Sequence, residues 1–370
     1  MILDNSKKTF LELLRAGLWG GEVWISKLEK HEYEEVYRLA EEQSVVGVVA
    51  LGLENIKGAK VPKPIALTFA GCALQIEQRN QAMDYFLGQL IDKLRESNIY
   101  THLVKGQGIA QCYEKPLWRA SGDIDFFLSR DNYERAKELL LPMASYVEIE
   151  NDSTLHQALT IDSWVVELHG SLRCGLSKRI DKVLDEIQDS IIFRGNVRSW
   201  MNENSQIFLP REDEDVVYVF SHILQHFFKG GIGIRQLCDL SRLLWTYKDS
   251  INQSLLLKRL KSMKVMTEWK AFGCLIVDTL GLPSEAMPFY DKSYNRKADK
   301  ILSYILEVGN FGHNKDVSYQ SELPALSRKM VTFWRQAKDS FRLASIFPID
   351  ASTFLLKYLS DGCKKAIKEH

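Results

Sequence analysis

The stretch Leu103–Ser129, LVKGQGIAQCYEKPLWRASGDIDFFLS, places two aspartates where a buried strand is expected. Side chains at positions i and i+2 of a strand point to the same face. Asp123 and Asp125 therefore project together, while Ile124 and Phe126 face the core on the other side. Two carboxylates this close repel each other unless a cation lies between them. Mg²⁺ is the natural occupant, because this hard ion binds carboxylates together with phosphate oxygens.

A third carboxylate is expected on a neighbouring strand, and Glu167 in the segment WVVELHG provides one. An acid in so apolar a strand is costly to bury without a partner. His169 follows two residues later and therefore lies on the same face. Two magnesium ions about 3.5–4 Å apart form the clamp used for in-line displacement at phosphorus. We expect Asp123, Asp125 and Glu167 to form one metal-binding triad on adjacent strands.

The beginning of the same stretch has features of a phosphate site. VKGQG at a strand end places a cation, Lys105, and backbone N–H groups where a triphosphate would lie. Gly106 and Gly108 allow close approach of the backbone. Arg119, four residues before the first aspartate, is a candidate for a second phosphate or acceptor contact.

The hydrophobic pattern predicts an α+β protein, with a small mixed sheet between two helical regions. Apolar residues repeat at intervals of three and four up to about residue 99, except in the loop KGAKVPKPI. Strand patterns then alternate with helices, and YVEIE, HQALTID and SWVVELHG are expected to be antiparallel neighbours. Helical patterns return after Pro210. The expected divisions are an N-terminal helical region, an α/β core and a C-terminal helical domain, at residues 1–75, 76–210 and 211–370.

Composition narrows the classes of partner. The chain has 370 residues, with 48 Lys and Arg balanced by 48 Asp and Glu. A net charge of zero argues against bulk capture of nucleic acid and favours a small-molecule or protein acceptor. The six cysteines form no close pairs and are interpreted as reduced thiols. The first residues lack the core of a signal peptide and no 18-residue apolar run occurs, so we expect a soluble cytoplasmic protein without a membrane span.

Taken together, the segments LVKGQGIAQCYEKPLWRASGDIDFFL and VVELHG resemble the nucleotidyltransferase superfamily of the DNA polymerase β type. They are most similar to a bacterial group of uncharacterised nucleotidyltransferases. Gly106 matches the first glycine of the superfamily pattern, Asp123 and Asp125 its acidic pair, and Glu167 its distant third acid. Gln107 departs from the usual Ser or Gly, and the gap of 15 residues before Asp123 is longer than usual.

The resemblance implies a reaction and a role for each acid. Asp123 and Asp125 would hold two Mg²⁺ ions, and Glu167 would hold the one nearer the acceptor. Lys105, Gly106, Gln107 and Arg119 would bind the nucleotide. An acceptor hydroxyl would attack the α-phosphorus of an NTP, with ATP as the expected donor, and pyrophosphate would leave. The alternative is a catalytically inactive nucleotide-binding or regulatory protein that keeps the fold.

Each of these residues also has a purely structural interpretation. Asp123 can serve as a turn or cap residue and Asp125 as a solvent-facing strand position. Glu167 can pair with Arg173 or Lys178, and His169 can be a hydrogen-bonded strand histidine. A metal-dependent glycosyltransferase would also use Asp-x-Asp, but it needs a long parallel domain before the acids, which the helical first 95 residues do not supply.

A second polar cluster occurs in FSHILQHFFKGGIGIRQLCDL, residues 220–240. His222 and His226 share one helix face, and Arg235 and Asp239 repeat this spacing on the next helix. Three interpretations of these residues are open: the lining of a cleft opposite the sheet, a His-His-Asp metal site serving a phosphohydrolase, or a polar network between helices with a solvated Arg–Asp pair. His313, in the loop GNFGHNKD, is interpreted as part of a turn. The segment 330–347 is predicted to be an amphipathic helix packed on the core, with membrane-surface binding as the alternative.

Overall fold

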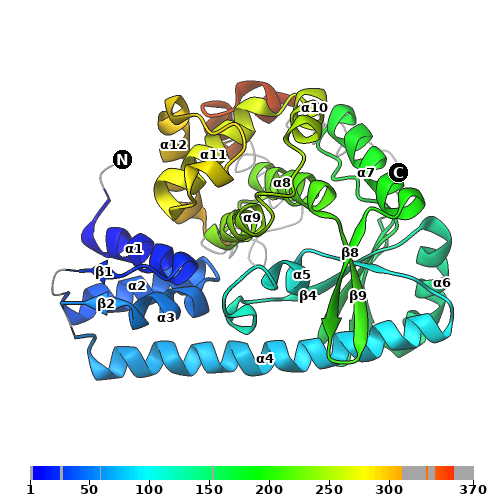
Figure 1. Ribbon diagram of the computed structural model, residues 1–370, viewed down its shortest axis with the longest axis horizontal. Helices are drawn as coiled ribbons and strands as arrows, with labels where there is room; N and C mark the ends of the chain where they lie inside the picture. The colour runs from blue at the N-terminus through cyan, green and yellow to red at the C-terminus, as the bar shows by residue number, and fades with distance from the viewer. Residues whose placement is uncertain are drawn as a thin grey trace.

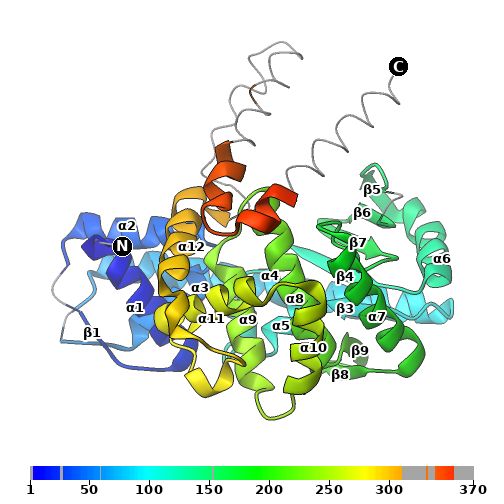
Figure 2. The ribbon, with the colours of Figure 1, turned by 90° about the horizontal axis from the view of Figure 1, so that it is seen from above.

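The computed structural model describes residues 3–25, 28–58, 60–151, 154–310, 331 and 338–353 of the chain. Its main sheet has the strand order β3-β4-β7-β6-β5. The strands β4 and β7 are parallel, and every other neighbouring pair is antiparallel (Figure 2). The predicted α+β fold with a mixed sheet is confirmed, as is the antiparallel arrangement of β5, β6 and β7. These strands are β3 (His102–Val104), β4 (Asp123–Phe127), β5 (Ala144–Val147), β6 (His156–Ile161) and β7 (Trp164–His169).

Helices surround this sheet on both sides. The helices of the described residues are α1 (Asn5–Trp19), α2 (Lys30–Glu42), α3 (Val46–Glu54), α4 (Lys63–Glu96), α5 (Gly106–Ala110), α6 (Arg130–Leu140), α7 (Lys178–Arg194), α8 (Glu212–Lys229), α9 (Ile234–Thr246), α10 (Gln253–Met263), α11 (Met266–Leu280) and α12 (Asn295–Val308). Short 3₁₀ turns lie between these elements, at Pro116–Trp118, Leu141–Met143, Ser284–Ala286 and Lys292–Tyr294.

The long helix α4 lies along one side of the whole molecule (Figure 1). Prolines of the predicted loop precede and open it, since Pro62 is its N-cap and Pro64 its second residue. The helix is continuous across residues 75 and 76, where a domain division was expected. Its C-terminal half packs Leu87 and Ile91 into a core that also contains Ile124 and Phe126 of β4. The apolar side of the Asp-x-Asp strand is therefore buried as predicted.

The two ends of the chain share a second core on the other side of the sheet. This core joins α1, α2 and α3 to the C-terminal helices, and it also includes Phe127 of β4. Arg15 and Trp19 of α1 donate hydrogen bonds to the carbonyl oxygens of Thr279 and Leu280, at 2.9 and 2.6 Å. The N-terminal helices are thus packed against the C-terminal region rather than forming an isolated unit.

Two small sheets and one helix were not anticipated from the sequence. Strands β8 (Val197–Asn202) and β9 (Ser205–Pro210) form an antiparallel hairpin, and β1 (Val23–Trp24) pairs with β2 (Ile56–Lys57). The hairpin contributes Ile207 and Leu209 to the core beneath the sheet. Helix α7 precedes the hairpin and begins at Ser177, whose hydroxyl oxygen accepts a hydrogen bond from the backbone N–H of Ile180.

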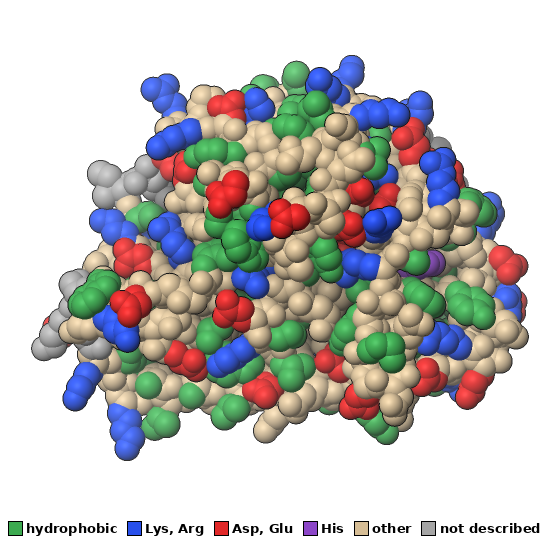
Figure 3. Space-filling model, in the orientation of Figure 1, with side chains coloured by type: hydrophobic (Ala, Val, Ile, Leu, Met, Phe, Trp, Pro, Cys, Tyr) green, Lys and Arg blue, Asp and Glu red, His purple; other side chains and the backbone are tan. Residues whose placement is uncertain are grey.

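Several expectations about the surface and the tail can be compared with the structure. Within the described ranges no helix is long and apolar enough to cross a membrane. The five described cysteines are free thiols; Cys363 lies outside those ranges, as does His313. In the tail, Leu343, Ile346 and Phe347 are buried in the core, in agreement with the packed interpretation. On the face shown in Figure 3, basic and acidic side chains are interspersed without a large area of one sign.

The predicted final helices, 326–343 and 351–368, are only partly described. Residues 338–343 and 351–353 are helical, and the remainder of both segments, apart from the helical residue 331, lies outside the described residues.

Candidate active site

The turn between β3 and α5 has an unusual backbone. Lys105 has φ 60° and ψ −149°, a region that residues with a Cβ rarely occupy, and Gly106 has φ 47°. This conformation directs the Lys105 side chain back over the sheet, where its Nζ lies 2.8 Å from Oδ1 of Asp125. Such strain persists only where the surrounding structure imposes it, and it is common at functional sites.

The predicted acids lie on one face of adjacent strands. Asp125 of β4 is the register partner of Glu167 of β7, and Asp123 is the partner of Val165. All three acids therefore project from the same face of the sheet. Asp125 is 2% exposed, so the interpretation of Asp125 as a solvent-facing residue is wrong.

Two histidines connect the acids. His169 Nε2 lies 2.9 Å from Asp125 Oδ1 and 3.3 Å from Glu167 Oε2. His156 Nε2, from the start of β6, lies 3.2 Å from the same Glu167 oxygen. Ionised carboxylates can only accept hydrogen bonds, so the imidazole nitrogens donate. Arg173, one of the two expected alternative partners of Glu167, pairs instead with Asp185 at 2.7 Å.

These contacts shift the pKa values of Asp123 and Glu167 in opposite directions. Repulsion from Asp125, together with burial, raises the pKa of Asp123. Burial would raise the pKa of Glu167, but hydrogen bonds from His156 and His169 outweigh it and hold that pKa far below its usual range. Glu167 is thus kept ionised, whereas the charges of Lys105 and Arg235 only partly offset the repulsion and burial that act on Asp123.

Arg119 is held mainly by contacts within the protein. Its Nε and Nη2 donate to the two carboxylate oxygens of Asp239 at 3.0 and 2.6 Å, and its Nη1 donates to Ser121 at 2.8 Å. Tyr113 also donates to Asp239, at 2.8 Å. The pair is buried, so the interpretation of Asp239 as part of a solvated pair with Arg235 is wrong. Arg119 and Asp239 instead fix the segment before Asp123 against α9.

Gln107 and Gly108 also pack against other parts of the protein. Gln107 is 2% exposed; its amide donates to Asp84 of α4 at 2.6 Å, and its carbonyl oxygen accepts from Ser121 at 2.6 Å. A Cβ on Gly108 would lie 2.5 Å from Leu209 of β9, so this glycine permits packing against the hairpin. The expectation that Gly108 makes room for a ligand is therefore wrong.

Helices α8 and α9 supply the opposite wall of the site. His222 and His226 of α8 have ring centroids 4.3 Å apart. Burial lowers the pKa of both, to about 4 for His226, so both rings are neutral at neutral pH. Arg235 of α9 donates through Nη1 to the carbonyl oxygen of Ala120 at 2.8 Å, while its Nε is buried without a hydrogen-bond partner. Burial, followed by the charge of Arg119, lowers the pKa of this guanidinium.

An open pocket of about 460 Å³ lies between these helices and the sheet. Its lining comes from β4, the strained turn, α5, α8 and α9, and consists of Lys105, Gly106, Ile109, Arg119, Asp123, Asp125, Val219, His222, Ile223, Arg235, Gln236 and Asp239. Of the residues expected to line a cleft opposite the sheet, His222, Arg235 and Asp239 line this pocket, whereas His169 and His226 do not.

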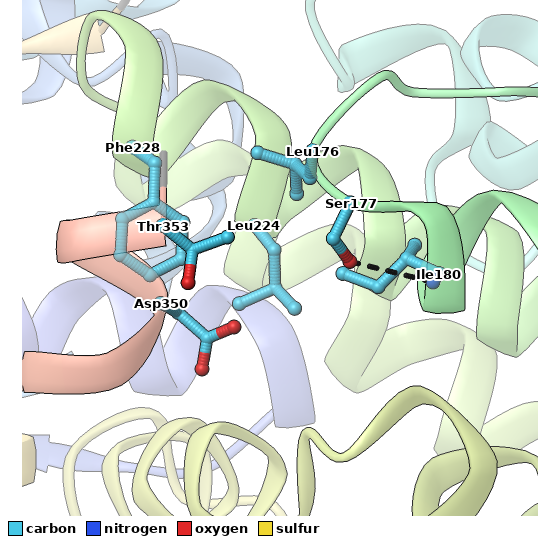
Figure 4. Close-up of a pocket in the computed structure, with 7 residues that line it drawn as sticks. All are labelled: Leu176, Ser177, Ile180, Leu224, Phe228, Asp350 and Thr353. Atoms are coloured by element: carbon cyan, nitrogen blue, oxygen red, sulfur yellow. Dashed lines mark hydrogen bonds between the residues drawn. The ribbon is translucent and has the colours of Figure 1, made fainter. Parts of the chain in front are cut away.

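A second pocket, of about 270 Å³, is drawn in Figure 4. Its lining is mainly apolar, and its polar groups are already engaged: Asp350 pairs with Arg179, and Ser177 caps α7. Such a pocket offers no group for acid–base or metal chemistry, and we assign the active site to the larger pocket.

One potential metal ligand, His156, was missed in the sequence. His156, Glu167 and His169 form a potential metal-binding group, because one donor atom from each lies within 4.8 Å of the other two. Among the described residues, this group meets that spacing. His222, His226 and Asp239 do not converge in this way, which excludes the expected His-His-Asp site in the structure as it stands. The donor atoms of Asp123, Asp125 and Glu167 do not meet this spacing either, because Asp123 lies two residues away from Asp125 along β4. The antiparallel pairing of HQALTID with SWVVELHG contained the signal for His156, since it sets His156 opposite His169.

An Asp-x-Asp strand beside a third acid, approached by a strained Lys-Gly turn, is an arrangement of the nucleotidyltransferase type. A family model described as uncharacterised nucleotidyltransferase matches residues 29–280 of the chain, from the start of α2 to the end of α11. The chain belongs to this family. No curated protein matches the chain, and no solved structure does so either.

Proposed function

We propose that the protein is a metal-dependent nucleotidyltransferase, which moves an NMP group from an NTP to the hydroxyl group of a small-molecule or protein acceptor. The observation that carries this proposal is the register of Asp125 with Glu167 beside Asp123, next to a pocket that also contains Lys105 and Arg235. Membership of a nucleotidyltransferase family supports the same class of reaction.

The donor set of the site fits Mg²⁺. Asp123 and Asp125 offer carboxylate oxygens from one strand face, and Glu167 offers a third beside them. The raised pKa of Asp123 shows an excess of negative charge that a cation would relieve. When bound, Mg²⁺ would neutralise phosphate charge and stabilise the departing pyrophosphate.

The chain's own residues would position the reactants. Arg235 has an uncommitted N–H beside the pocket, and in the described part of the chain it has no carboxylate within ion-pair distance. It is therefore better suited than Arg119 to bind the β- or γ-phosphate. Lys105 would share its charge between Asp125 and the nucleotide.

The reaction forms a bond between the acceptor oxygen and the α-phosphorus. The hydroxyl proton leaves to solvent, and the bond from the α-phosphorus to its bridging oxygen breaks. Pyrophosphate takes the electron pair of that bond. Catalysis then depends mainly on positioning and on charge stabilisation. ATP is the proposed donor, and the free thiols are consistent with an enzyme of the cytoplasm.

The test combines binding and turnover. The full-length chain is incubated with Mg²⁺ and each α-³²P-labelled NTP, with a panel of small hydroxyl compounds and proteins, and pyrophosphate release is measured in parallel. We expect Mg-dependent label transfer, and its loss in the double variant Asp123→Asn with Asp125→Asn.

Asp162→Asn is the matched control, because Asp162 is exposed in the turn between β6 and β7 and asparagine tolerates its φ of 52°. If the double variant binds Mg-NTP as the wild type does, the proposed site is wrong. Mg-NTP binding that needs both aspartates, without pyrophosphate release for any NTP or acceptor, would instead favour the inactive regulatory protein.

A further inference from the structure

Two histidines converge on one carboxylate oxygen at the edge of the candidate active site. His156 of β6 and His169 of β7 are register partners on antiparallel strands, and their ring centroids lie 4.7 Å apart. Their Nε2 atoms lie 3.2 and 3.3 Å from the same oxygen, Oε2 of Glu167. The three side chains are 30%, 13% and 24% exposed, respectively, so the group is sheltered but accessible to an ion.

The spacing of these atoms matches the coordination shell of a small metal ion. Zinc binds histidine nitrogen at about 2.0–2.1 Å and carboxylate oxygen at about 2.0–2.2 Å, which separates neighbouring donors in a tetrahedral site by roughly 3.3 Å. The two observed nitrogen-to-oxygen distances have this value. Asp125 Oδ1, 2.9 Å from His169 Nε2, is the next donor along, although it also pairs with Lys105 Nζ at 2.8 Å.

Magnesium does not account for these nitrogen atoms. It is a hard ion that takes oxygen ligands, whereas imidazole nitrogen suits zinc, copper, iron and nickel ions. The oxygen-only position beside Asp123 and the nitrogen-containing position beside His156 therefore differ in the metal that they favour.

We propose that His156, Glu167 and His169 form a binding site for a divalent transition metal. This site favours a different metal from the Mg²⁺ position at Asp123. Asp125 or water completes the coordination. The proposal stands without the transferase activity, because the metal binds to the chain in the absence of nucleotide.

The first experiment titrates the metal-free, full-length protein with Co²⁺ and follows the visible d–d absorption. We expect one Co²⁺ per chain with the intense band of low coordination, displacement by Zn²⁺, and no displacement by a large excess of Mg²⁺. His156→Ala should weaken Co²⁺ binding by at least about 100-fold, since the loss of an outer partner alone costs about 10–100-fold.

The controls separate this site from the magnesium site. His31→Ala removes an exposed imidazole from α2 and should leave Co²⁺ binding unchanged. Asp123→Asn should abolish Mg-NTP binding and leave Co²⁺ binding intact. If the transferase proposal fails, the Co²⁺ result is unaffected. If Co²⁺ does not bind, the transferase proposal is likewise unaffected.

The second experiment needs no variant. Pulsed electron paramagnetic resonance of bound Cu²⁺, a paramagnetic ion that imidazole suits, should show coupling to histidine nitrogen in the wild type. Absence of nitrogen coupling, or equal Co²⁺ affinity in the wild type and His156→Ala, would overturn the proposal and leave the two histidines as hydrogen-bond donors to Glu167.

Discussion

Asp125 and Glu167 lie side by side on the parallel strands β4 and β7, and one nitrogen atom of His169 reaches both. Lys105, the residue after β3 on the other side of β4, contacts the same Asp125 oxygen. The parallel pair therefore holds two of the acids in ion pairs, while Asp123, at the start of β4, has none among the described residues. The difference predicts different consequences for removing each charge.

Asp123→Asn should stabilise the protein and destroy its function. The pKa of Asp123 is raised by the repulsion of Asp125 and by burial, so its charge at neutral pH opposes folding. Asparagine removes that charge with little change in shape, and we expect a higher free energy of unfolding. Mg-dependent turnover should fall at least about 100-fold. Urea unfolding and pyrophosphate release measure the two effects, with Asp162→Asn as the control.

Gln107→Ser introduces the residue type that is usual in the superfamily at this position. Because Gln107 bonds Asp84 and Ser121 rather than facing the pocket, we expect a loss of about 1–2 kcal/mol in stability. The affinity for Mg-NTP should change by less than about threefold, equivalent to about 0.7 kcal/mol.

Thermal unfolding and calorimetric titration of the nucleotide measure the two quantities for this variant. Gln111→Ser, one helical turn further on, is the matched control for amide removal. A large loss of nucleotide affinity with unchanged stability would show that Gln107 binds phosphate after all.

The parts of the fold that the sequence predicted correctly are those governed by local pattern. DIDFF gave β4 because apolar residues flank the acids with strand periodicity, and the helix after it begins at Ser129, whose hydroxyl oxygen accepts from Asn132 N–H. The β8–β9 hairpin also has alternating residues around the turn at Glu203, yet it was not singled out. Helix α7 had clear boundary signals as well, in Ser177 and Gly195.

The site was harder to predict where it depends on pairing between distant segments. The three acids could be named from residue type and strand periodicity. The roles of Arg119 and Gln107 could not, since they depend on Asp239 of α9 and Asp84 of α4 lying within reach. A local pattern indicates which side chains share a face, but the packing of helices decides which of them have spare hydrogen-bonding capacity.

Stability should depend on pH through Glu268 of α11. Burial and the nearby Asp350 raise the pKa of Glu268 to about 8, from an ordinary value of 4.5. For a carboxyl whose folded-state pKa is raised, the contribution to stability is fully present below pH 4.5 and is lost as the pH rises through about 8. The protein should therefore lose stability between these limits.

Glu268→Gln removes this titration and provides the measurement. We expect the variant to be about 1–3 kcal/mol more stable than the wild type near pH 9 and nearly equal to it near pH 5, by denaturant unfolding at both values. Glu285→Gln, in the 3₁₀ turn after α11, is the control. Equal curves for wild type and Glu268→Gln across the whole range would contradict the assignment.

Arg235→Met tests the proposed phosphate contact. Burial and the charge of Arg119 disfavour the Arg235 cation, but its removal also breaks the hydrogen bond to the Ala120 carbonyl, so we expect the free energy of unfolding to change by less than about 1 kcal/mol. A hydrogen bond to a charged group is worth about 1.5–3 kcal/mol, so the affinity for Mg-NTP should fall by roughly 10–150-fold. The loss should be smaller for NMP, which lacks the β- and γ-phosphates.

Arg242→Met is the matched control on the same helix. Arg242 donates to the carbonyl oxygens of Cys112 and Leu18, at 2.8 and 2.7 Å, and does not line the pocket. Its removal leaves buried carbonyl groups without partners and should reduce stability without changing nucleotide affinity. Calorimetric titration with a non-hydrolysable NTP and with NMP, beside urea unfolding, compares both variants. If Arg235→Met lowers NTP and NMP affinity equally, Arg235 does not contact the β- or γ-phosphate, because only those groups distinguish the two ligands.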